Sequence, residues 1–184
     1  MRLTDLRTPA LILDRGVMAA NIAAMSNRAK AFGIDLKPHM KTSKCAEIAR
    51  LATAGHSGGL CVSTVEEVRY FAGEGFSDIT YAVGIAPDKL ADLAPALDAG
   101  ARVTLLLDDP AAARVVAARA EALDLRFPVL IEIDSGMHRA GLAPEAAEIV
   151  EIGGILAAAS HLEPAGVLTH GGQSYAARGA EDCR

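Results

Sequence analysis

The order of apolar and amphipathic segments is the feature that most restricts the fold of this chain. Short apolar runs alternate with helical stretches along nearly the whole sequence, and the turns between them are short. We predict strands over residues 9–14, 34–41, 59–63, 78–83, 103–107, 127–134 and 166–169. We predict helices over residues 18–32, 44–54, 64–72, 88–97, 109–123 and 144–152. This alternation predicts a parallel α/β fold, but the pattern alone does not separate a doubly wound sheet from a TIM barrel.

The composition agrees with this class. Hydrophobic residues make up 51% of the 184 residues, aromatic residues only 4%, and the mean hydropathy is +0.25. A core of Ala, Leu, Ile and Val suits helices packed on strands that are covered on both faces. Such a chain is not disordered, and its length fits one domain, or one domain plus a fragment of another.

Charge and cysteine usage restrict the partners and the compartment. The formal net charge is −5 and no Lys/Arg cluster stands out, which argues against a nucleic-acid partner. No run of 18 apolar residues predicts a membrane span, and the N-terminus does not resemble a secretory signal. Cys45, Cys61 and Cys183 are far apart and form no CxxC pair, so we expect a reducing cytoplasm.

Polar residues follow several predicted strands, where the chemistry of a barrel is located. The densest group surrounds Lys41, which ends a predicted strand. We expect Lys37 and Lys44, as positive neighbours, to favour the neutral Lys41 amine that attacks a carbonyl. The alternative interpretation is a solvated basic turn with three surface lysines.

Two further loops carry candidate residues. After the strand at 127–134, Arg139 can pair with an anionic group, and Asp134 can orient that arginine or cap the loop; the alternative is a structural Asp–Arg pair. After the last strand, two glycines permit a close backbone approach, and Ser174 and Tyr175 offer hydroxyls to a phosphate or carboxylate. His170 alone, at a strand end, is also compatible with a structural role.

Other chemistries lack their motifs. No GxGxxG follows a strand, so a dinucleotide-binding fold loses its main support, and no Gly-x-Ser-x-Gly indicates a serine hydrolase. His56 and His161 have no partners at ligand spacing, so we predict no metal site within this chain.

Four motifs in order carry a family resemblance: Thr8-Pro-Ala-Leu-Ile-Leu-Asp14, Pro38-His-Met-Lys-Thr42, Asp134-Ser-Gly-Met-His-Arg139 and His170-Gly-Gly-Gln-Ser-Tyr175. They resemble the N-terminal barrel of the alanine-racemase superfamily, and most nearly its D-serine dehydratase/D-threonine aldolase branch. The resemblance implies a TIM-type (β/α)8 barrel that binds pyridoxal phosphate. Six barrel strands would end near Lys41, Ser63, Val83, Leu107, Asp134 and Thr169, and the segment at 9–14 would join a later β-domain.

On this resemblance the chain, residues 1–184, is an incomplete barrel domain. The last two barrel strands and the C-terminal β-domain are absent, so the resemblance implies a truncated barrel that is inactive alone. The cofactor is pyridoxal 5′-phosphate, held by a Schiff base to Lys41. The other cofactor-binding residues implied are His39, Thr64, Arg139, His170, Ser174 and Tyr175. A divalent metal is expected only in the missing domain, and the full-length family member is expected to be a homodimer.

The resemblance implies a lyase that acts on a D-amino acid with a β-hydroxyl, as a D-serine dehydratase or D-threonine aldolase does. In such enzymes the cofactor drains electrons from the substrate Cα, and the alignment of the substrate decides which bond breaks. Three alternatives remain open. They are an amino-acid racemase, a non-catalytic pyridoxal-phosphate-binding barrel for cofactor homeostasis, and a phosphate-binding TIM barrel without this cofactor.

Overall fold

Five parallel strands with helices packed on them form the body of the fold in the computed structural model, which describes residues 2–179 and 181. The strands are β1 (Leu60–Val62), β2 (Asp78–Gly84), β3 (Arg102–Leu107), β4 (Phe127–Ile133) and β5 (Leu162–Thr169). The α-helices are α1 (Arg15–Ala31), α2 (Ala46–Thr53), α3 (Val65–Gly73), α4 (Ala94–Asp98), α5 (Pro110–Leu123) and α6 (Ala147–Ala158). Short 3-10 helices are η1 (Leu3–Asp5), η2 (Pro87–Leu93) and η3 (Gly172–Ala176). Cys183, the third of the cysteines named above, lies outside the described residues.

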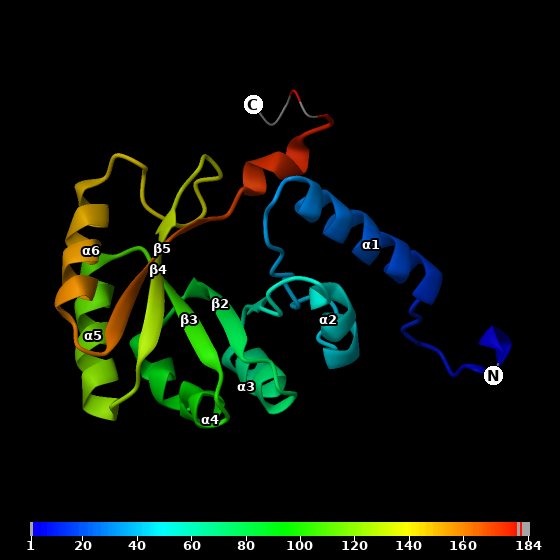
Figure 1. The fold of residues 1–184 in the computed structure, drawn as a ribbon, viewed down its shortest axis with the longest axis horizontal. Helices are drawn as coiled ribbons and strands as arrows, with labels where there is room; N and C mark the ends of the chain where they lie inside the picture. The colour runs from blue at the N-terminus through cyan, green and yellow to red at the C-terminus, as the bar shows by residue number, and fades with distance from the viewer. Residues whose placement is uncertain (1, 180, 182–184) are drawn as a thin grey trace.

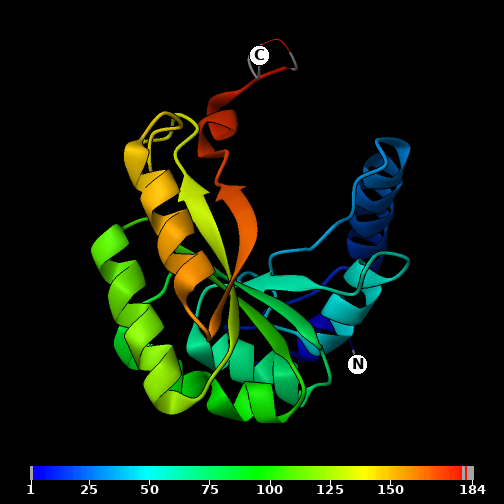
Figure 2. The same ribbon diagram turned by 60° about the vertical axis from the view of Figure 1, so that its left-hand side comes forward.

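The strands lie in the sheet in their sequence order, β1-β2-β3-β4-β5, and each neighbouring pair is parallel. The sheet is curved, and α3, α4, α5 and α6 cover its outer face, whereas no α-helix packs on the inner face in these views (Figures 1 and 2). The parallel α/β class is therefore confirmed. The strand order and the curvature are those of consecutive strands of a barrel, in which each helix returns the chain to the same end of the sheet.

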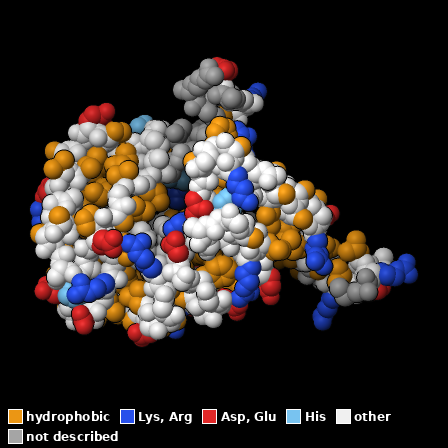
Figure 3. All heavy atoms as spheres, viewed as in Figure 1, with side chains coloured by type: hydrophobic (Ala, Val, Ile, Leu, Met, Phe, Trp, Pro, Cys, Tyr) orange, Lys and Arg blue, Asp and Glu red, His pale blue; other side chains and the backbone are white. Residues whose placement is uncertain are grey.

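The hydrophobic core lies between the sheet and its covering helices. Fully buried side chains include Phe71 on α3, Tyr81 on β2, Leu105 on β3 and Ile152 on α6. The helix α1 is not part of this core, because only its Ala29 is buried. Hydrophobic side chains accordingly lie on the surface along α1, and others gather over α6 and β5 (Figure 3).

Two of the predicted strands are not strands in the structure. Residues 9–14 form no strand and their side chains are exposed. Residues 34–41 contribute a single bridge, in which His39 pairs in parallel with Cys61, because Pro38 has no N–H to extend a ladder. The segment before Lys41 therefore lies at the edge of the sheet, next to β1, but it is not a full strand.

The helix starts predicted near residues 64 and 109 are confirmed, and each has a side-chain cap. Thr64 accepts the N–H of Glu67 at the start of α3, and Asp109 accepts the N–H of Ala112 at the start of α5. The helix predicted over 88–97 is split into η2 and α4, because Pro95 cannot donate the hydrogen bond that a continuous helix requires.

The predicted helix at 144–152 differs more. The structure places α6 at Ala147–Ala158, so the helix starts later and continues through Gly153 and Gly154. Burial of Ile152 and Leu156, one helical turn apart, outweighs the low helix propensity of the two glycines. Within the described part of the chain, no helix has the length and apolar character that a membrane crossing requires.

Candidate functional site

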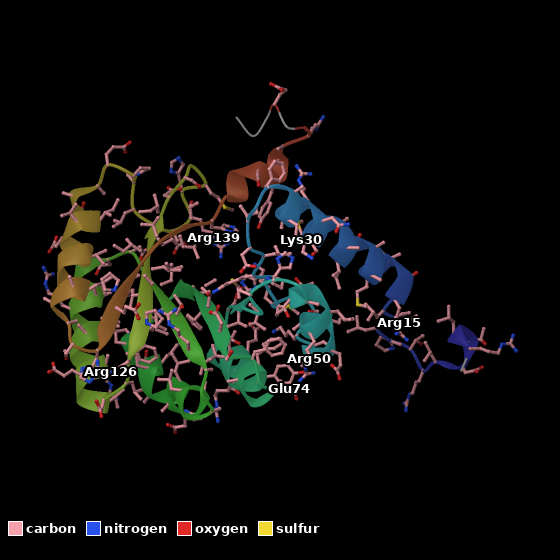
Figure 4. The ribbon with its side chains drawn as sticks, viewed as in Figure 1. Arg15, Lys30, Arg50, Glu74, Arg126 and Arg139 are labelled. Atoms are coloured by element: carbon pink, nitrogen blue, oxygen red, sulfur yellow. The ribbon has the colours of Figure 1, made fainter. Side chains whose placement is uncertain are left out.

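A pocket opens at the carboxyl ends of the strands, where a parallel barrel places its chemistry. It is lined by His39, Lys41, Ser63, Ala82, Val83, Gly84, Glu132, Asp134, Met137, Arg139, Ala140, Leu168 and His170. Four residues predicted from the sequence as cofactor-binding meet here: His39, Lys41, Arg139 and His170. Figure 4 shows Arg139 at this end of the sheet and Arg126 at the opposite end.

Lys41 lies in a tight turn (residues 39–44), which we call the Lys41 turn. The N–H of Lys44 donates to Met40 O at 2.9 Å, and Lys44 has a left-handed φ of 45°. The two neighbouring lysines are engaged: Lys37 Nζ lies 2.6 Å from Asp78 Oδ2, and Lys44 Nζ lies 3.0 Å from Glu67 Oε1. Among the described residues, Lys41 has no such carboxylate partner.

This arrangement corrects one expectation about the three lysines. Carboxylates neutralise Lys37 and Lys44, so neither acts as the free positive neighbour that we expected beside Lys41. All three lysines are exposed, as the alternative of a basic surface turn predicts, but two of them are held in ion pairs and the third lines the pocket. The pairs instead leave Lys41 as the one lysine of the motif whose amine is available in the pocket of the described chain.

His39 connects the Lys41 turn to the end of β1. Its Nδ1 accepts the backbone N–H of Lys41 at 3.2 Å, and its Nε2 lies 3.2 Å from Ser63 Oγ. Because Nδ1 is an acceptor, the neutral ring carries its proton on Nε2 and donates it to Ser63. Desolvation lowers the pKa of His39 and the charge of Lys41 lowers it further, so the ring stays neutral around pH 7.

The loop after β4 is organised by Asp134. Its Oδ1 accepts the N–H groups of Gly136 at 2.9 Å and His138 at 3.0 Å, and its Oδ2 lies 2.8 Å from His138 Nδ1. The two backbone bonds hold the pKa of Asp134 below its ordinary value. Asp134 thus caps the loop, as one of our two expectations had it. No Asp134–Arg139 ion pair is present among the described residues, which leaves the Arg139 guanidinium free of that carboxylate.

The return of this loop to the sheet requires glycine. Gly141 has a φ of 94°, and a Cβ there would lie 2.7 Å from the backbone N of Asp134. Its N–H donates to Asp108 Oδ2 at 3.0 Å, at the end of β3, and Leu142 exchanges backbone hydrogen bonds with residues 132 and 134. The loop that carries Arg139 is therefore fixed at both of its ends.

The capping role of Asp134 gives a testable expectation. Asp134→Ala removes both backbone bonds and should raise the hydrogen-exchange rates of the Gly136 and His138 amides about tenfold, because the loop that carries Arg139 loses its cap. Asp134→Asn keeps an acceptor oxygen and should raise these rates less than threefold. Hydrogen exchange of each variant followed by NMR, with circular dichroism to confirm folding, measures the difference. Equal exchange rates in the two variants would contradict the capping role.

The pH dependence of the loop follows from the direction of the same shift. The folded-state pKa of Asp134 lies below its ordinary value of 3.8, so its stabilising effect is complete above that value. The effect is lost as the pH falls through the lower, folded-state pKa. We expect the Gly136 and His138 amides to stay protected from hydrogen exchange at pH 4 and to lose protection only in stronger acid, which NMR would follow.

Glu132 is a pocket residue that the sequence analysis missed. It lies on β4 and is only 8% exposed. Burial raises the pKa of its carboxyl and the nearby Asp108 adds to the rise, while Arg139 opposes it. The available signal was a charged residue inside an apolar strand, since the segment at 127–133 reads Phe-Pro-Val-Leu-Ile-Glu-Ile. Such a glutamate is expected to face an interior that contains a partner or a ligand.

The loop after β5 contributes His170 to the pocket. His170 Nε2 is buried and has no hydrogen-bond partner among the described residues. Its ring meets Tyr175 edge-on, with the centroids 5.7 Å apart. Gly172 lies against Met137 and His170 so closely that a Cβ there would collide with Met137 Sδ. The unpaired nitrogen at the pocket wall is the type of atom that a polar ligand satisfies.

Three predicted cofactor residues do not line the pocket. The hydroxyl of Thr64 is used as the cap of α3, and that of Ser174 donates to Gly171 O at 2.7 Å. Tyr175 is 74% exposed and reaches the site only through its contact with His170. Their role toward a cofactor stays a prediction. Among the described residues, no three His, Cys, Asp or Glu side chains form a group that could hold a metal ion.

Comparisons with known proteins find relatives that share this sequence and this fold. D-threo-3-hydroxyaspartate dehydratase of Delftia sp. (strain HT23) is 37% identical over 173 residues, which cover 94% of this chain and 46% of the relative. Its solved structure superposes with a TM-score of 0.86. D-serine dehydratase of Dictyostelium discoideum is 28% identical over 185 residues, or 94% of this chain and 47% of the relative. The structure of D-threonine aldolase from Filomicrobium marinum is 32% identical, with a TM-score of 0.80 over 90% of this chain and 44% of that one.

The chain spans about half the length of these relatives. Residues 13–182 match the family described as the alanine racemase N-terminal domain, which is most of the sequence. A match of this extent, together with the strand order and the pocket, establishes the family. The chain belongs to the alanine racemase N-terminal domain family, among homologues named as dehydratases and aldolases of D-amino acids.

Proposed function

We propose that the complete gene product is a pyridoxal-phosphate-dependent lyase that acts on a D-amino acid with a β-hydroxyl, with Lys41 as the residue that binds the cofactor covalently. The observation that carries the proposal is the pocket itself. It brings Lys41 and Arg139 from two distant loops to the carboxyl ends of the strands, and the ion pairs of Lys37 and Lys44 leave Lys41 as the available amine.

The residues present fit this cofactor. Its aldehyde requires a primary amine, its ring oxygen is anionic, and its ring presents further polar atoms. The pocket offers the Lys41 amine, the Arg139 guanidinium, and the buried Nε2 of His170, which has no partner among the described residues. The names of the relatives support the same assignment, since they describe a dehydratase and an aldolase of D-amino acids.

Each pocket residue has a role that its surroundings favour. When bound, pyridoxal phosphate supplies a conjugated ring that withdraws electrons from the substrate Cα. Lys41 would hold the cofactor, and Arg139 would orient the ring through its anionic oxygen. Glu132, whose pKa is raised, is the pocket acid that most readily holds a proton beside Arg139. Neutral His39 would fix the backbone of Lys41 without adding a charge next to its amine.

The substrate class is inferred from the homologues. Relatives are named for 3-hydroxyaspartate, serine and threonine in the D configuration, and each of these amino acids carries a hydroxyl on Cβ. We therefore propose either loss of that hydroxyl or cleavage of the Cα–Cβ bond. We place any divalent metal ligands, and the formation of a homodimer, in parts of the protein beyond these residues. Cytoplasm is the compartment we propose.

The test uses the complete gene product with pyridoxal phosphate and three substrates, D-threo-3-hydroxyaspartate, D-serine and D-threonine. Dehydration releases ammonia and a keto acid, whereas aldol cleavage releases glycine and an aldehyde. The L-enantiomers are the control, and appearance of an L-amino acid from the D-form would instead identify a racemase. Cofactor binding without turnover of any amino acid would favour a homeostasis protein, and no binding at all would favour a barrel without this cofactor.

Arg139 provides a second test of the site. We expect Arg139→Leu to lower turnover by about 100-fold or more and to shift the absorbance of the bound cofactor, because a positive group beside the ring is lost. Arg126→Leu is the matched control, since Arg126 lies at the other end of β4 and bonds only Ser160 O among the described contacts. The turnover rates and cofactor spectra of the two variants show whether Arg139 acts on the cofactor. An unchanged spectrum and rate in Arg139→Leu would make that residue structural.

A further inference from the structure

A closed ring of side-chain contacts holds the Lys41 turn against β1 and α3. Lys44 Nζ pairs with Glu67 Oε1 at 3.0 Å, and the backbone N–H of Ser63 donates to Glu67 Oε2 at 2.8 Å. Ser63 Oγ in turn lies 3.2 Å from His39 Nε2, and His39 Nδ1 accepts the N–H of Lys41 at 3.2 Å. The contacts thus begin and end on the same turn, and both branches meet at Glu67.

Glu67 is well suited to this central position. Its side chain is only 7% exposed, on the first turn of α3, while Lys44 opposite it is 60% exposed. Burial alone raises the pKa of Glu67, but the N–H of Ser63, the Lys44 ammonium and the N–H of Thr64 outweigh it and lower the pKa below its ordinary value. The carboxylate is therefore ionised and held in one orientation by partners on two sides.

The backbone of the turn requires such support. Lys44 adopts a φ of 45°, which is uncommon for a residue other than glycine and persists only where the surroundings fix it. The N–H of Lys44 bonds to Met40 O, and its side chain bonds to Glu67. Loss of the ion pair with Glu67 would let Lys44, which ends the turn, change its backbone conformation. The direction of Lys41, three residues earlier, would then be less defined.

We propose that Glu67 is a positioning residue for Lys41: through Lys44, and through Ser63 and His39, it fixes the turn so that Lys41 Nζ faces the pocket. Glu67 itself does not line the pocket, so it would act only through the turn. The inference rests on the proposed function, because it assigns to Glu67 the placement of the amine that would bind pyridoxal phosphate.

The test compares variants of the complete gene product. Glu67→Gln keeps an acceptor for Ser63 but loses the charge that pairs with Lys44. We expect the dissociation constant for pyridoxal phosphate to rise about tenfold and the pH midpoint of covalent attachment to shift. Lys44→Met should have the same effect, Glu67→Gln/Lys44→Met no further effect, and Lys44→Arg little effect. Glu66→Gln is the control, since Glu66 is 83% exposed and lies beside Glu67 outside the ring.

A measurement without cofactor completes the experiment. An amine-reactive reagent labels Lys41 at graded pH, and peptide mass mapping gives the rate for each variant; the two charge-removing variants should change this rate at least threefold. Because Lys44 is exposed, Lys44→Met carries the test if the Glu67 variant does not fold. Wild-type affinity, pH midpoint and labelling in both variants would overturn the positioning role and leave the proposed function standing. A wild-type protein that never attaches the cofactor at Lys41 would refute the proposed function instead.

Discussion

Replacement of Lys41 by methionine is expected to abolish covalent attachment of pyridoxal phosphate and to lower turnover by about 10⁴-fold or more. The reason is the chemistry of the site: a carbonyl cofactor needs a primary amine, and the other two lysines of the motif are held by Asp78 and Glu67. Borohydride reduction of the protein with its cofactor, followed by peptide mass mapping, shows which lysine is modified.

Lys37→Met is the matched control for this experiment. Lys37 stands four residues before Lys41 in the same basic motif, but its amine pairs with Asp78 at the start of β2, away from the pocket. We expect that variant to retain labelling at Lys41 and turnover within about threefold of the wild type. Label found on Lys44 in the wild-type protein, with Lys41 unmodified, would refute the assignment.

The elements that could be predicted from the sequence are those that local chemistry determines. The alternation of strands and helices predicted the parallel α/β class, and the helix starts predicted near residues 64 and 109 are present, where Thr64 and Asp109 cap α3 and α5. Such signals act within a few residues and do not depend on distant partners. They fail where tertiary packing decides, as at α6, where burial of Leu156 extends the helix past two glycines.

The two wrong strand predictions have a different cause. A strand needs a partner, and an apolar run only shows that a segment is suitable for one. Leu11 and its neighbours are apolar but exposed, with no strand beside them among the described residues, and Pro38 limits the segment before Lys41 to one bridge. Sequence periodicity carries no information about whether the partner strand is present.

The pocket was predicted in its main residues but not in its electrostatics. Lys41, Arg139 and His170 could be named because each follows a predicted strand, and strand ends meet at one edge of a parallel sheet. The ion pair between Lys44 and Glu67 joins residues on different elements, and no local pattern reveals it. Glu132 was missed for a similar reason, since its raised pKa depends on burial and on the Asp108 and Arg139 side chains around it.

Residues 1–184 expressed alone are expected to aggregate, to bind pyridoxal phosphate weakly at best, and to show no measurable turnover. Of the eight residues of β5 only Leu162 is buried, and Val167 is 63% exposed. An uncovered strand at the edge of a sheet pairs readily with other chains. The exposed apolar side chains of α1, such as Met25, add a second surface of this kind.

The weak binding follows from the same geometry. Phosphate groups on TIM-type barrels are commonly held by loops after the seventh and eighth strands, whereas the described residues contain five strands and the bridged segment before Lys41. Lys41 and Arg139 can be placed without those loops, but a poorly anchored ring is misaligned, and a small misplacement costs on the order of 100-fold in rate. Light scattering, cofactor absorbance and turnover of D-serine and D-threonine by residues 1–184, beside the complete gene product, make the comparison. A soluble, monomeric product with turnover like that of the complete protein would show that these strands suffice to build the site.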